Sequence, residues 1–587
     1  MDAIALRGNT FGTPADLWRF RLSFFSDRAA ALRATRRGVL GTLAGSLGSI
    51  VLIATQPHAP WAIALAIVAA LAYTFVARDL PDYIDSAAAG AALCVPIWIA
   101  FDIIVVPLGT GEPLQWTAAG MHAALPQLGG WVSFGFTFGI ILQALQRAAR
   151  ARLGPEPVPA RAVAPTLRRI VIVGGGFAGM TTAKSLEREL RGDRSVDVTL
   201  VSATNALLFT PMLAEVAGGS IEPSHISSPA RTALHRTTFV RAAVSGVDFE
   251  RRVVRADDRD IAYDQLVLAV GAVSNYLGLD GVERWSLDFK TLLDAVTVRN
   301  HVIEMFERAD REQDPALRRK RLTFVIAGGG FAGAELAGAV NDLARGILTD
   351  YPKLTGDELR VIVVHSGKRI LPELSATLAA YALERMTARG VTFRLGVRVA
   401  SAARGVVRLT DGHDIETESL IWTAGTTPNP LLGALDVARD RRGAVVVDET
   451  LAVAGKPGVW ALGDCAAVTD AKTKMPCPPT AQFALREAET VARNIRATLR
   501  DRAPDGFHFD SLGALCVVGY QTACAELALP LGRGRAVRFS GLFAWILWRG
   551  IYLAKLPGIE RKVRVLIDWT VELFFPRDIV QTIDLQS

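Results

Sequence analysis

Residues 170–179 read Ile-Val-Ile-Val-Gly-Gly-Gly-Phe-Ala-Gly, an apolar β-branched run that passes directly into a glycine-rich turn. The same hexapeptide, Gly-Gly-Gly-Phe-Ala-Gly, recurs at residues 328–333 behind Phe-Val-Ile-Ala at 324–327. An alanine-rich stretch of helical composition follows each copy. This duplicated strand–turn–helix pattern predicts an α/β fold with two Rossmann-like dinucleotide-binding domains.

The spacing of the glycines explains why such a turn binds a dinucleotide. In a Gly-x-Gly-x-x-Gly turn, one glycine allows the tight bend, the second lets the backbone approach a pyrophosphate, and the third packs the helix closely. Two copies in this context predict two nucleotide sites, although two nucleotide-free βαβ units are an alternative. The candidate residues are Gly174, Gly176, Phe177, Ala178 and Gly179 in the first copy, and Gly328, Gly330 and Gly333 in the second.

Composition excludes several classes of protein. Half of the 587 residues are hydrophobic but 21% are charged, which fits neither an all-membrane transporter nor a disordered chain. The net charge is +7, yet the basic residues form no aromatic-rich stripe, so we expect no nucleic-acid partner. The five cysteines show no CxxC or metal-ligand spacing, and we therefore expect no disulfide framework, zinc site, iron–sulfur cluster or other metal.

The first quarter of the chain is rich in apolar segments. About 20 apolar residues cross a hydrocarbon core of about 30 Å. The first three segments therefore predict membrane-spanning helices, although the second is slightly short, and Pro126 and Gly129-Gly130 interrupt the fourth. The four segments are residues 38–56, 61–77, 86–108 and 120–145.

Charges beside these segments predict the topology. Arginines cluster before the first segment, at 19–37, and after the fourth, at 147–152, whereas the turns at 57–60 and 109–115 carry no Lys or Arg. Basic flanks stay in the cytoplasm, so four crossings and an integral inner (cytoplasmic) membrane protein are predicted. Asp102 lies inside the third segment and needs a partner there. We expect an interhelix or intersubunit hydrogen bond rather than a proton path.

The soluble part begins after the proline-rich residues 153–166, which predict an extended linker. Far downstream, the apolar run at 459–462 ends in Gly463-Asp464. The order of two glycine motifs followed by Gly-Asp is what a flavin domain split by an inserted nicotinamide domain would produce.

From about Leu167 to its C-terminus the chain resembles the type II NADH:quinone oxidoreductases, flavoproteins with two dinucleotide-binding domains. Residues 208–213 (Leu-Phe-Thr-Pro-Met-Leu), 328–335 and 478–482 (Pro-Pro-Thr-Ala-Gln) carry the match. The resemblance implies FAD at the first glycine motif, with Asp464 on its ribityl–phosphate side, and NADH or NADPH at the second. It places Glu335 near flavin and nicotinamide. For Asp464 the plainer alternative is a turn residue at the end of a strand. For Glu335 it is an acid in the first turn of a helix, where the helix dipole favours negative charge.

Two positions depart from the family pattern. Ser202 replaces the acid that often closes the second strand of the FAD fold, and its hydroxyl can still reach the ribose. The resemblance assigns Thr480, Ala481 and Gln482 to the quinone site. It implies that Gln482 and Glu335 are catalytic. Further along the same segment, Arg486 stands where the family has glutamine. Arg486 could bond a quinone carbonyl, repel the quinone, or pair with Glu487 or Glu489 at the surface.

The C-terminal region, residues 541–583, interleaves aromatic and basic residues on helix-length segments. Such segments suit a surface in the lipid headgroup region, and packing on the second domain is the alternative. We expect these domains: residues 1–152 transmembrane, 153–166 linker, 167–320 and 441–505 FAD-binding, 321–440 NAD(P)-binding, and 506–587 membrane-docking. The expected partners are a membrane quinone (ubiquinone or menaquinone), the bilayer and a second copy of the chain.

Coenzyme choice depends on the end of the strand after the second motif. NAD-specific sites usually end this strand with Asp or Glu, but here His365 follows Val361-Ile362-Val363-Val364, and Lys368 and Arg369 stand close behind. These cations could bind a 2′-phosphate or simply face solvent. We predict that NADPH is used at least as well as NADH.

These features predict a flavoprotein that passes hydride from NAD(P)H to FAD and electrons to a membrane quinone without pumping protons. The catalytic part would lie on the cytoplasmic side. Two alternatives remain open at this point. One is an NAD(P)H-dependent enzyme with another reaction, which either reduces an electron-transfer protein or carries out sulfide:quinone chemistry at Cys465 and Cys477. The other is a nucleotide-sensing flavoprotein scaffold.

Overall fold

The computed structural model describes residues 28–76, 82–111, 122–154, 168–528 and 536–581. The chain divides into two compact units, residues 1–163 and 164–587. Most of the expected linker and the arginine-rich residues before 28 lie outside the described residues.

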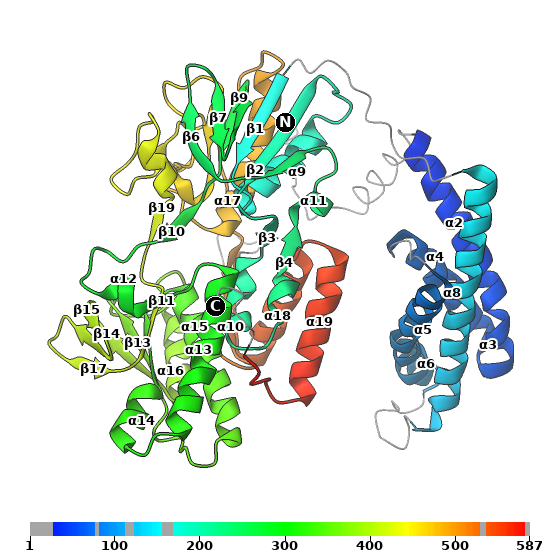
Figure 1. Ribbon diagram of the computed structural model, residues 1–587, viewed down its shortest axis with the longest axis horizontal. Helices are drawn as coiled ribbons and strands as arrows, with labels where there is room; N and C mark the ends of the chain where they lie inside the picture. The colour runs from blue at the N-terminus through cyan, green and yellow to red at the C-terminus, as the bar shows by residue number, and fades with distance from the viewer. Residues whose placement is uncertain (1–27, 77–81, 112–121, 155–167, 529–535, 582–587) are drawn as a thin grey trace, which may run out of the picture. The chain divides into compact units, whose positions relative to one another are not determined.

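Helices make up the described part of the first unit (Figure 1). Three described helical stretches are long and apolar enough to cross a membrane, namely Thr35–Thr55, Tyr83–Thr110 and Leu125–Leu153, and Ala59–Thr74 is shorter. The helices are α2 (Arg28–Gly48), α3 (Ile50–Thr55), α4 (Ala59–Val76), α5 (Tyr83–Trp98), a π-helix (Ile99–Val105), α6 (Val106–Thr110) and α8 (Leu125–Leu153).

Helix α8 begins at Leu125 and continues through Gly129-Gly130, so these glycines do not interrupt the helix as expected. Pro126 lies in the first turn of α8, where its missing N–H has no helical partner to lose. Gly130 is needed for close packing, because a Cβ there would collide with Thr55 Oγ1. The expected interhelix hydrogen bond of Asp102 is confirmed: Trp131 Nε1 of α8 donates to its carboxylate at 2.6 Å.

In the second unit, the first glycine motif follows the central strand of a five-stranded parallel sheet (Figure 1). The run before Gly463 joins this sheet as an edge strand, and α9 and α17 pack against each other. The sheet order is β21 (Val459–Ala461), β9 (Gln265–Leu268), β1 (Arg168–Val173), β2 (Val196–Ser202) and β5 (Thr238–Arg241), with α9 at Phe177–Glu189 and α17 at Ala481–Thr498.

The second glycine motif follows the central strand of another five-stranded parallel sheet. The α/β class with Rossmann-like parallel sheets is therefore confirmed. The order is β11 (Ser286–Asp288), β18 (Ser419–Trp422), β12 (Thr323–Ala327), β13 (Arg360–His365) and β14 (Val391–Leu395), with helices α13 (Leu292–Asp310), α15 (Phe331–Ile347) and α16 (Ala376–Ala388).

Shorter elements connect these layers. They include β3 (Ala206–Leu208), α10 (Leu213–Ala217), β4 (Ser227–Pro229), α11 (Ala230–Ala233), β6 (Val244–Asp248), β7 (Val253–Ala256), β8 (Arg259–Ala262), β10 (Ala272–Ser274), α12 (Val282–Trp285), α14 (Pro315–Arg321), β15 (Val399–Ala403), β16 (Val406–Leu409), β17 (Asp414–Glu416), β19 (Thr426–Pro428), β20 (Val445–Val446) and β22 (Ala466–Ala467).

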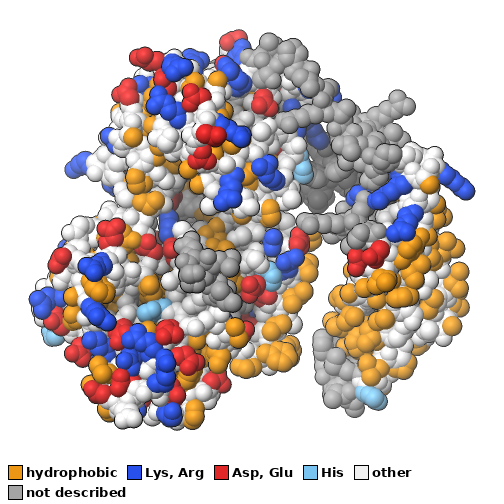
Figure 2. Space-filling model, in the orientation of Figure 1, with side chains coloured by type: hydrophobic (Ala, Val, Ile, Leu, Met, Phe, Trp, Pro, Cys, Tyr) orange, Lys and Arg blue, Asp and Glu red, His pale blue; other side chains and the backbone are white. Residues whose placement is uncertain are grey.

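An antiparallel sheet that the sequence analysis does not anticipate precedes the C-terminal helices. It consists of β23 (Gly513–Val517), β24 (Ala523–Ala528) and β25 (Ala536–Ser540), followed by α18 (Gly541–Lys555) and α19 (Ile559–Phe574). Both helices bury one face, while hydrophobic side chains gather on the outside of α19 (Figure 2). The exposed apolar residues of the two helices include Leu542, Phe543, Ile546, Ile559, Val563, Leu566, Ile567, Val571 and Phe574.

Candidate active site

The first glycine turn has the shape of a pyrophosphate cradle. Gly174 has φ +109°, and a Cβ there would collide with the carbonyl of Ala269. Gly179 packs against the carbonyl of Gly174. Gly176, the N-cap of α9, faces open space, so the N–H groups of the first helical turn at Phe177 and beyond can reach an anion.

Two polar groups from other elements lie beside this turn. Ser202 ends β2, and a Cβ on Gly175 would lie 2.6 Å from its hydroxyl oxygen. Gly463 follows β21 with φ +73°, and a Cβ there would lie 3.2 Å from Cβ of Ala178. The fold therefore brings Gly463-Asp464 against the start of α9, although the two are distant in sequence.

Two residues that the sequence analysis missed hold the Gly-Asp turn. Glu487 of α17 accepts a 2.7 Å hydrogen bond from the N–H of Gly463. Lys290 lies 3.7 Å from the carboxylate of Asp464. Burial raises the pKa of Asp464, and Lys290 partly offsets this effect. No sequence pattern marks either partner, because both contacts join distant segments.

These observations fit FAD. An anion cradle, a hydroxyl at the end of β2 and a carboxylate at the Gly-Asp turn are the groups needed for its pyrophosphate, ribose and ribityl chain.

The second glycine turn repeats the first. Gly328 has φ +115°, Gly333 packs against the carbonyl of Gly328, and Gly330 caps α15. Near the open side of Gly330 stands the carboxylate of Glu373, 3.3 Å from where a Cβ would lie. A bound nucleotide would have to move this flexible side chain aside.

His365 closes β13 beside this turn. Its Nδ1 accepts a 3.1 Å hydrogen bond from the N–H of Gly329, which assigns the ring proton to Nε2. Burial lowers the pKa of His365, so the ring is neutral near pH 7. Lys368 and Arg369 are exposed, and Arg369 donates to the carbonyl of Pro372 at 2.9 Å. The structure thus brings His365, but neither cation, into contact with the glycine turn.

Glu335 lies on α15 and accepts a 3.3 Å hydrogen bond from the N–H of Val517 on β23. Burial raises its pKa to about 8. A carboxyl with such a pKa can hold or release a proton near neutral pH.

The residues expected at the quinone site start α17. Thr480 is its N-cap, Ala481 is its first residue, and Gln482 accepts a 3.1 Å hydrogen bond from the hydroxyl of Ser511. Arg486 pairs with Glu489 at 3.0 Å, one of the open alternatives, while Glu487 instead points inward to Gly463. Arg486 does not bond to Gln482 or Thr480 in this arrangement.

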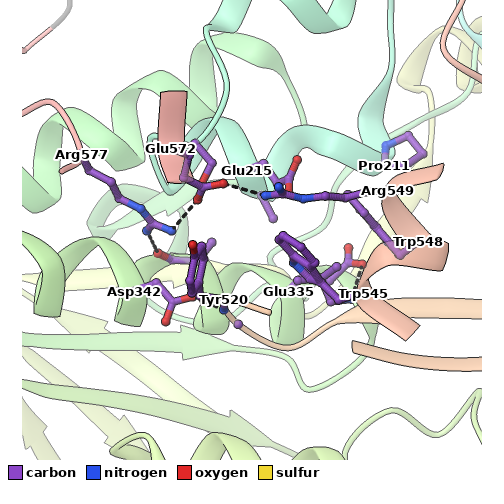
Figure 3. Close-up of a pocket in the computed structure, with 15 residues that line it drawn as sticks. Pro211, Glu215, Glu335, Asp342, Tyr520, Trp545, Trp548, Arg549, Glu572 and Arg577 are labelled. Atoms are coloured by element: carbon purple, nitrogen blue, oxygen red, sulfur yellow. Dashed lines mark hydrogen bonds and ion pairs between the residues drawn. The ribbon is translucent and has the colours of Figure 1, made fainter. Parts of the chain in front are cut away.

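A buried charge network was also missed by the sequence analysis (Figure 3). Arg549 of α18 pairs with Glu572 of α19 at 2.6 Å and lies 3.8 Å from Glu215 of α10. Its guanidinium carbon lies 3.7 Å from the ring centre of Trp545 and 4.6 Å from that of Trp569. The pattern could not be found from spacing, because α10 lies far upstream of both helices.

The cysteines offer no reactive thiolate near neutral pH. Burial raises the pKa of Cys465 and Cys477 to about 11, which argues against sulfide:quinone chemistry there. Among the described residues, no group of three or more His, Cys, Asp or Glu side chains could hold a metal ion.

Comparison with known proteins finds similarity across most of the second unit. A family described as pyridine nucleotide-disulphide oxidoreductase matches residues 168–488, and the NDH2 C-terminal domain matches residues 512–578. The type II NADH:quinone oxidoreductase Ndh of Mycobacterium tuberculosis is 31% identical, over 72% of this chain and 92% of its own length. The mitochondrial external NADH-ubiquinone oxidoreductase 2 of Saccharomyces cerevisiae is 27% identical over 72% of this chain and 85% of its own.

Solved structures agree on the fold. NDH2 from Plasmodium falciparum, solved in complex with NADH, superposes with a TM-score of 0.64 at 18% identity and covers 70% of this chain and 99% of its own. The sulfide:quinone oxidoreductase of Aquifex aeolicus gives 0.55 at 18% identity, with 70% and 95% covered.

Proposed function

The chain belongs to the type II NADH:quinone oxidoreductase family, and from this premise we propose how its residues carry NADH oxidation and quinone reduction. It is an FAD-dependent enzyme that moves electrons from NADH to a quinone without pumping protons. The observation that carries the residue assignments is the pair of glycine cradles on parallel sheets, with Glu335 between the second cradle and the C-terminal sheet.

We assign the first cradle to FAD. Gly174, Gly176 and Gly179 would hold its pyrophosphate, Ser202 its ribose, and Asp464 its ribityl chain, with Glu487 and Lys290 positioning the Gly-Asp turn. Bound FAD supplies the hydride acceptor and the electron donor. Gly328, Gly330, Gly333 and His365 would hold the nicotinamide nucleotide, and Glu335 would lie where the two cofactors meet.

The quinone is assigned to the start of α17. Gln482 would orient the quinone there, with Thr480 and Ala481 beside it. Either ubiquinone or menaquinone fits this chemistry. We also propose the domain division expected from the sequence, except that β11 pairs with the second sheet, so the first FAD-binding segment ends before Ser286 and not at residue 320.

Membrane attachment is also part of the proposal. Helices α2–α8 would form an integral four-helix anchor, with its basic flanks and the catalytic unit on the cytoplasmic side. The apolar outer faces of α18 and α19 would dock in the headgroup region of the same membrane. We further propose a homodimer, which a mass measurement in lipid nanodiscs tests.

A stopped-flow experiment on the full chain in lipid tests the function. Protein reduced with NADH should be reoxidised by ubiquinone or menaquinone within one turnover. Reduced flavin that persists with both quinones but reacts with a small electron-transfer protein would overturn the proposal. Reduced flavin that persists with every acceptor would instead indicate a sensing scaffold.

A further inference from the structure

A cavity of about 30 Å³ lies where α10, α15, α18 and α19 meet (Figure 3). Carboxyl groups from three elements line it, namely Glu215, Glu335, Asp342 and Glu572. A cavity of this volume has room for one or two water molecules.

The walls of this cavity contain donors that need an acceptor. Arg549 Nε and Trp548 Nε1 are buried, and neither has a hydrogen-bond partner among the residues that the structure describes. An unpaired buried N–H is costly, so an occupant with acceptor atoms is indicated. An anion is disfavoured by the surrounding carboxyls. Water fits, because it accepts from the two N–H groups and donates to the carboxyls.

The two buried acids of the charge network, Glu572 and Glu215, differ in how many cations and hydrogen-bond donors contact their carboxylates. Glu572 is held by Arg549 at 2.6 Å, by Arg577 at 3.2 Å and by the hydroxyl of Ser220 at 2.7 Å. Two arginines and a hydroxyl therefore contact Glu572 directly.

Glu215 has weaker support. It accepts a 2.9 Å bond from Trp569 Nε1, and its closest cation, Arg549, stands 3.8 Å away. The pKa of Glu215 is raised to about 7, mainly by burial; Arg549 opposes this rise, Glu572 adds to it, and Trp569 and Arg577 oppose it more weakly. Near neutral pH, Glu215 can therefore exchange a proton.

Quinone reduction by NADH consumes a proton. The hydride brings two electrons and one proton, whereas the quinol needs two electrons and two protons. The second proton must come from solvent through the protein.

We propose that Glu215 delivers this second proton to Glu335 through water in the cavity. In the transfer, protonated Glu215 becomes a carboxylate and the Glu335 carboxylate becomes protonated. Glu335 then gives its proton to a quinone oxygen, and Glu215 is reprotonated from solvent. This inference rests on the proposed function, because it needs quinone as the acceptor.

The test uses the flavin-loaded full chain in lipid with Glu215→Gln, which keeps the shape but cannot release a proton. We expect reduction by NADH at the wild-type rate and quinone-driven reoxidation slowed at least about tenfold. Ferricyanide, which accepts electrons without protons, should still reoxidise the variant normally. The solvent deuterium isotope effect on the quinone step should rise, and its rate should lose the wild-type decline above about pH 7.

Matched variants separate this role from a structural one. Glu572→Gln removes a charge from the same network and should lower stability without changing the isotope effect. Glu215→Asp should retain most of the quinone rate and serves as the second variant if Glu215→Gln folds poorly. Near pH 6 the infrared absorption of protonated carboxyls should be weaker by one carboxyl in Glu215→Gln than in wild type, because Glu335 and Glu487 keep their own raised pKa values and still absorb.

The outcomes are distinguishable. Wild-type protein that reduces no quinone contradicts the proposed function itself. Active wild type together with a Glu215→Gln variant of unchanged quinone rate, isotope effect and infrared spectrum overturns the proton delivery alone. If Glu215→Gln slowed flavin reoxidation by quinone and by ferricyanide equally, the proton delivery would also be overturned, because that result indicates a structural role for Glu215.

Discussion

The main-chain N–H of Gly463 donates a 2.7 Å hydrogen bond to the buried carboxyl of Glu487, and this contact ties the Gly-Asp turn to α17. The same helix begins with the proposed quinone site. The proposed flavin and quinone sites thus share α17, so a change in this helix is expected to affect both. The predictions below test the turn, the helix and the neighbouring nucleotide site.

Asp464→Ala should lose flavin. The purified protein is expected to be yellow with one tightly bound FAD and no metal, and removal of the carboxylate takes away the proposed ribityl contact while leaving Lys290 uncompensated. Flavin absorbance per chain after desalting measures the loss. Asp436→Ala, which removes an exposed carboxylate paired with Lys456, is the control and should keep its flavin. Full FAD occupancy of Asp464→Ala contradicts the assignment.

Glu487→Gln should change how stability depends on pH. Burial raises the pKa of Glu487 to about 7 in the folded chain, above its unfolded value, so the fold binds the proton more tightly. Its contribution to stability is therefore fully present below the unfolded pKa and is lost as pH rises through the folded value.

This loss is at most about 3 kcal/mol. Thermal unfolding between about pH 5 and pH 8 measures it as the difference in slope between the two proteins. Glu487→Gln cannot titrate and should show the shallower decline. Parallel curves would contradict the prediction.

Coenzyme choice follows from His365. The residue that closes β13 is a histidine in place of the Asp or Glu that usually repels a 2′-phosphate, so NADPH should be used at least as well as NADH. His365→Glu should shift preference toward NADH by roughly tenfold, since a carboxylate there bonds ribose hydroxyls and repels phosphate. Steady-state kcat/KM for both coenzymes decides the matter. A wild-type advantage of tenfold or more for NADH would refute this prediction and leave quinone reduction untouched.

Arg486→Gln, which restores the family residue, should alter the quinone KM by less than about threefold. The guanidinium is 44% exposed and already paired with Glu489, and exposed pairs of this kind contribute little. Gln482→Ala in the same helix is the comparison and should raise the quinone KM much more. A large effect of Arg486→Gln would show that the cation reaches the quinone.

Asp102→Asn should leave quinone reductase turnover largely intact. The amide oxygen can still accept from Trp131 Nε1, and interhelix hydrogen bonds of this type contribute about 0.6 kcal/mol on average. Turnover in vesicles and oligomer mass in nanodiscs measure activity and assembly. Trp131→Phe, which removes the donor, should weaken assembly more. Complete loss of activity in a folded, flavin-loaded Asp102→Asn protein would favour a proton path instead.

The sequence alone determined the parallel α/β fold and its two glycine turns, because strand, turn and helix are consecutive there and each glycine answers a local steric demand. The apolar segments were equally readable, since helix length and composition are local properties. The expected break at Gly129-Gly130 is not found, and Pro126 is tolerated because it lies in the first turn of α8.

Only the tertiary structure decided which side chains meet. Lys290 reaches Asp464, Glu487 reaches Gly463, and Arg549 joins Glu572 and Glu215, in each case across segments with no fixed spacing between them. Their surroundings depend on burial and on the partners that packing supplies, so glutamates that look alike in the sequence differ in the fold. Chain packing, and not residue type, therefore distinguishes Glu215 from Glu572.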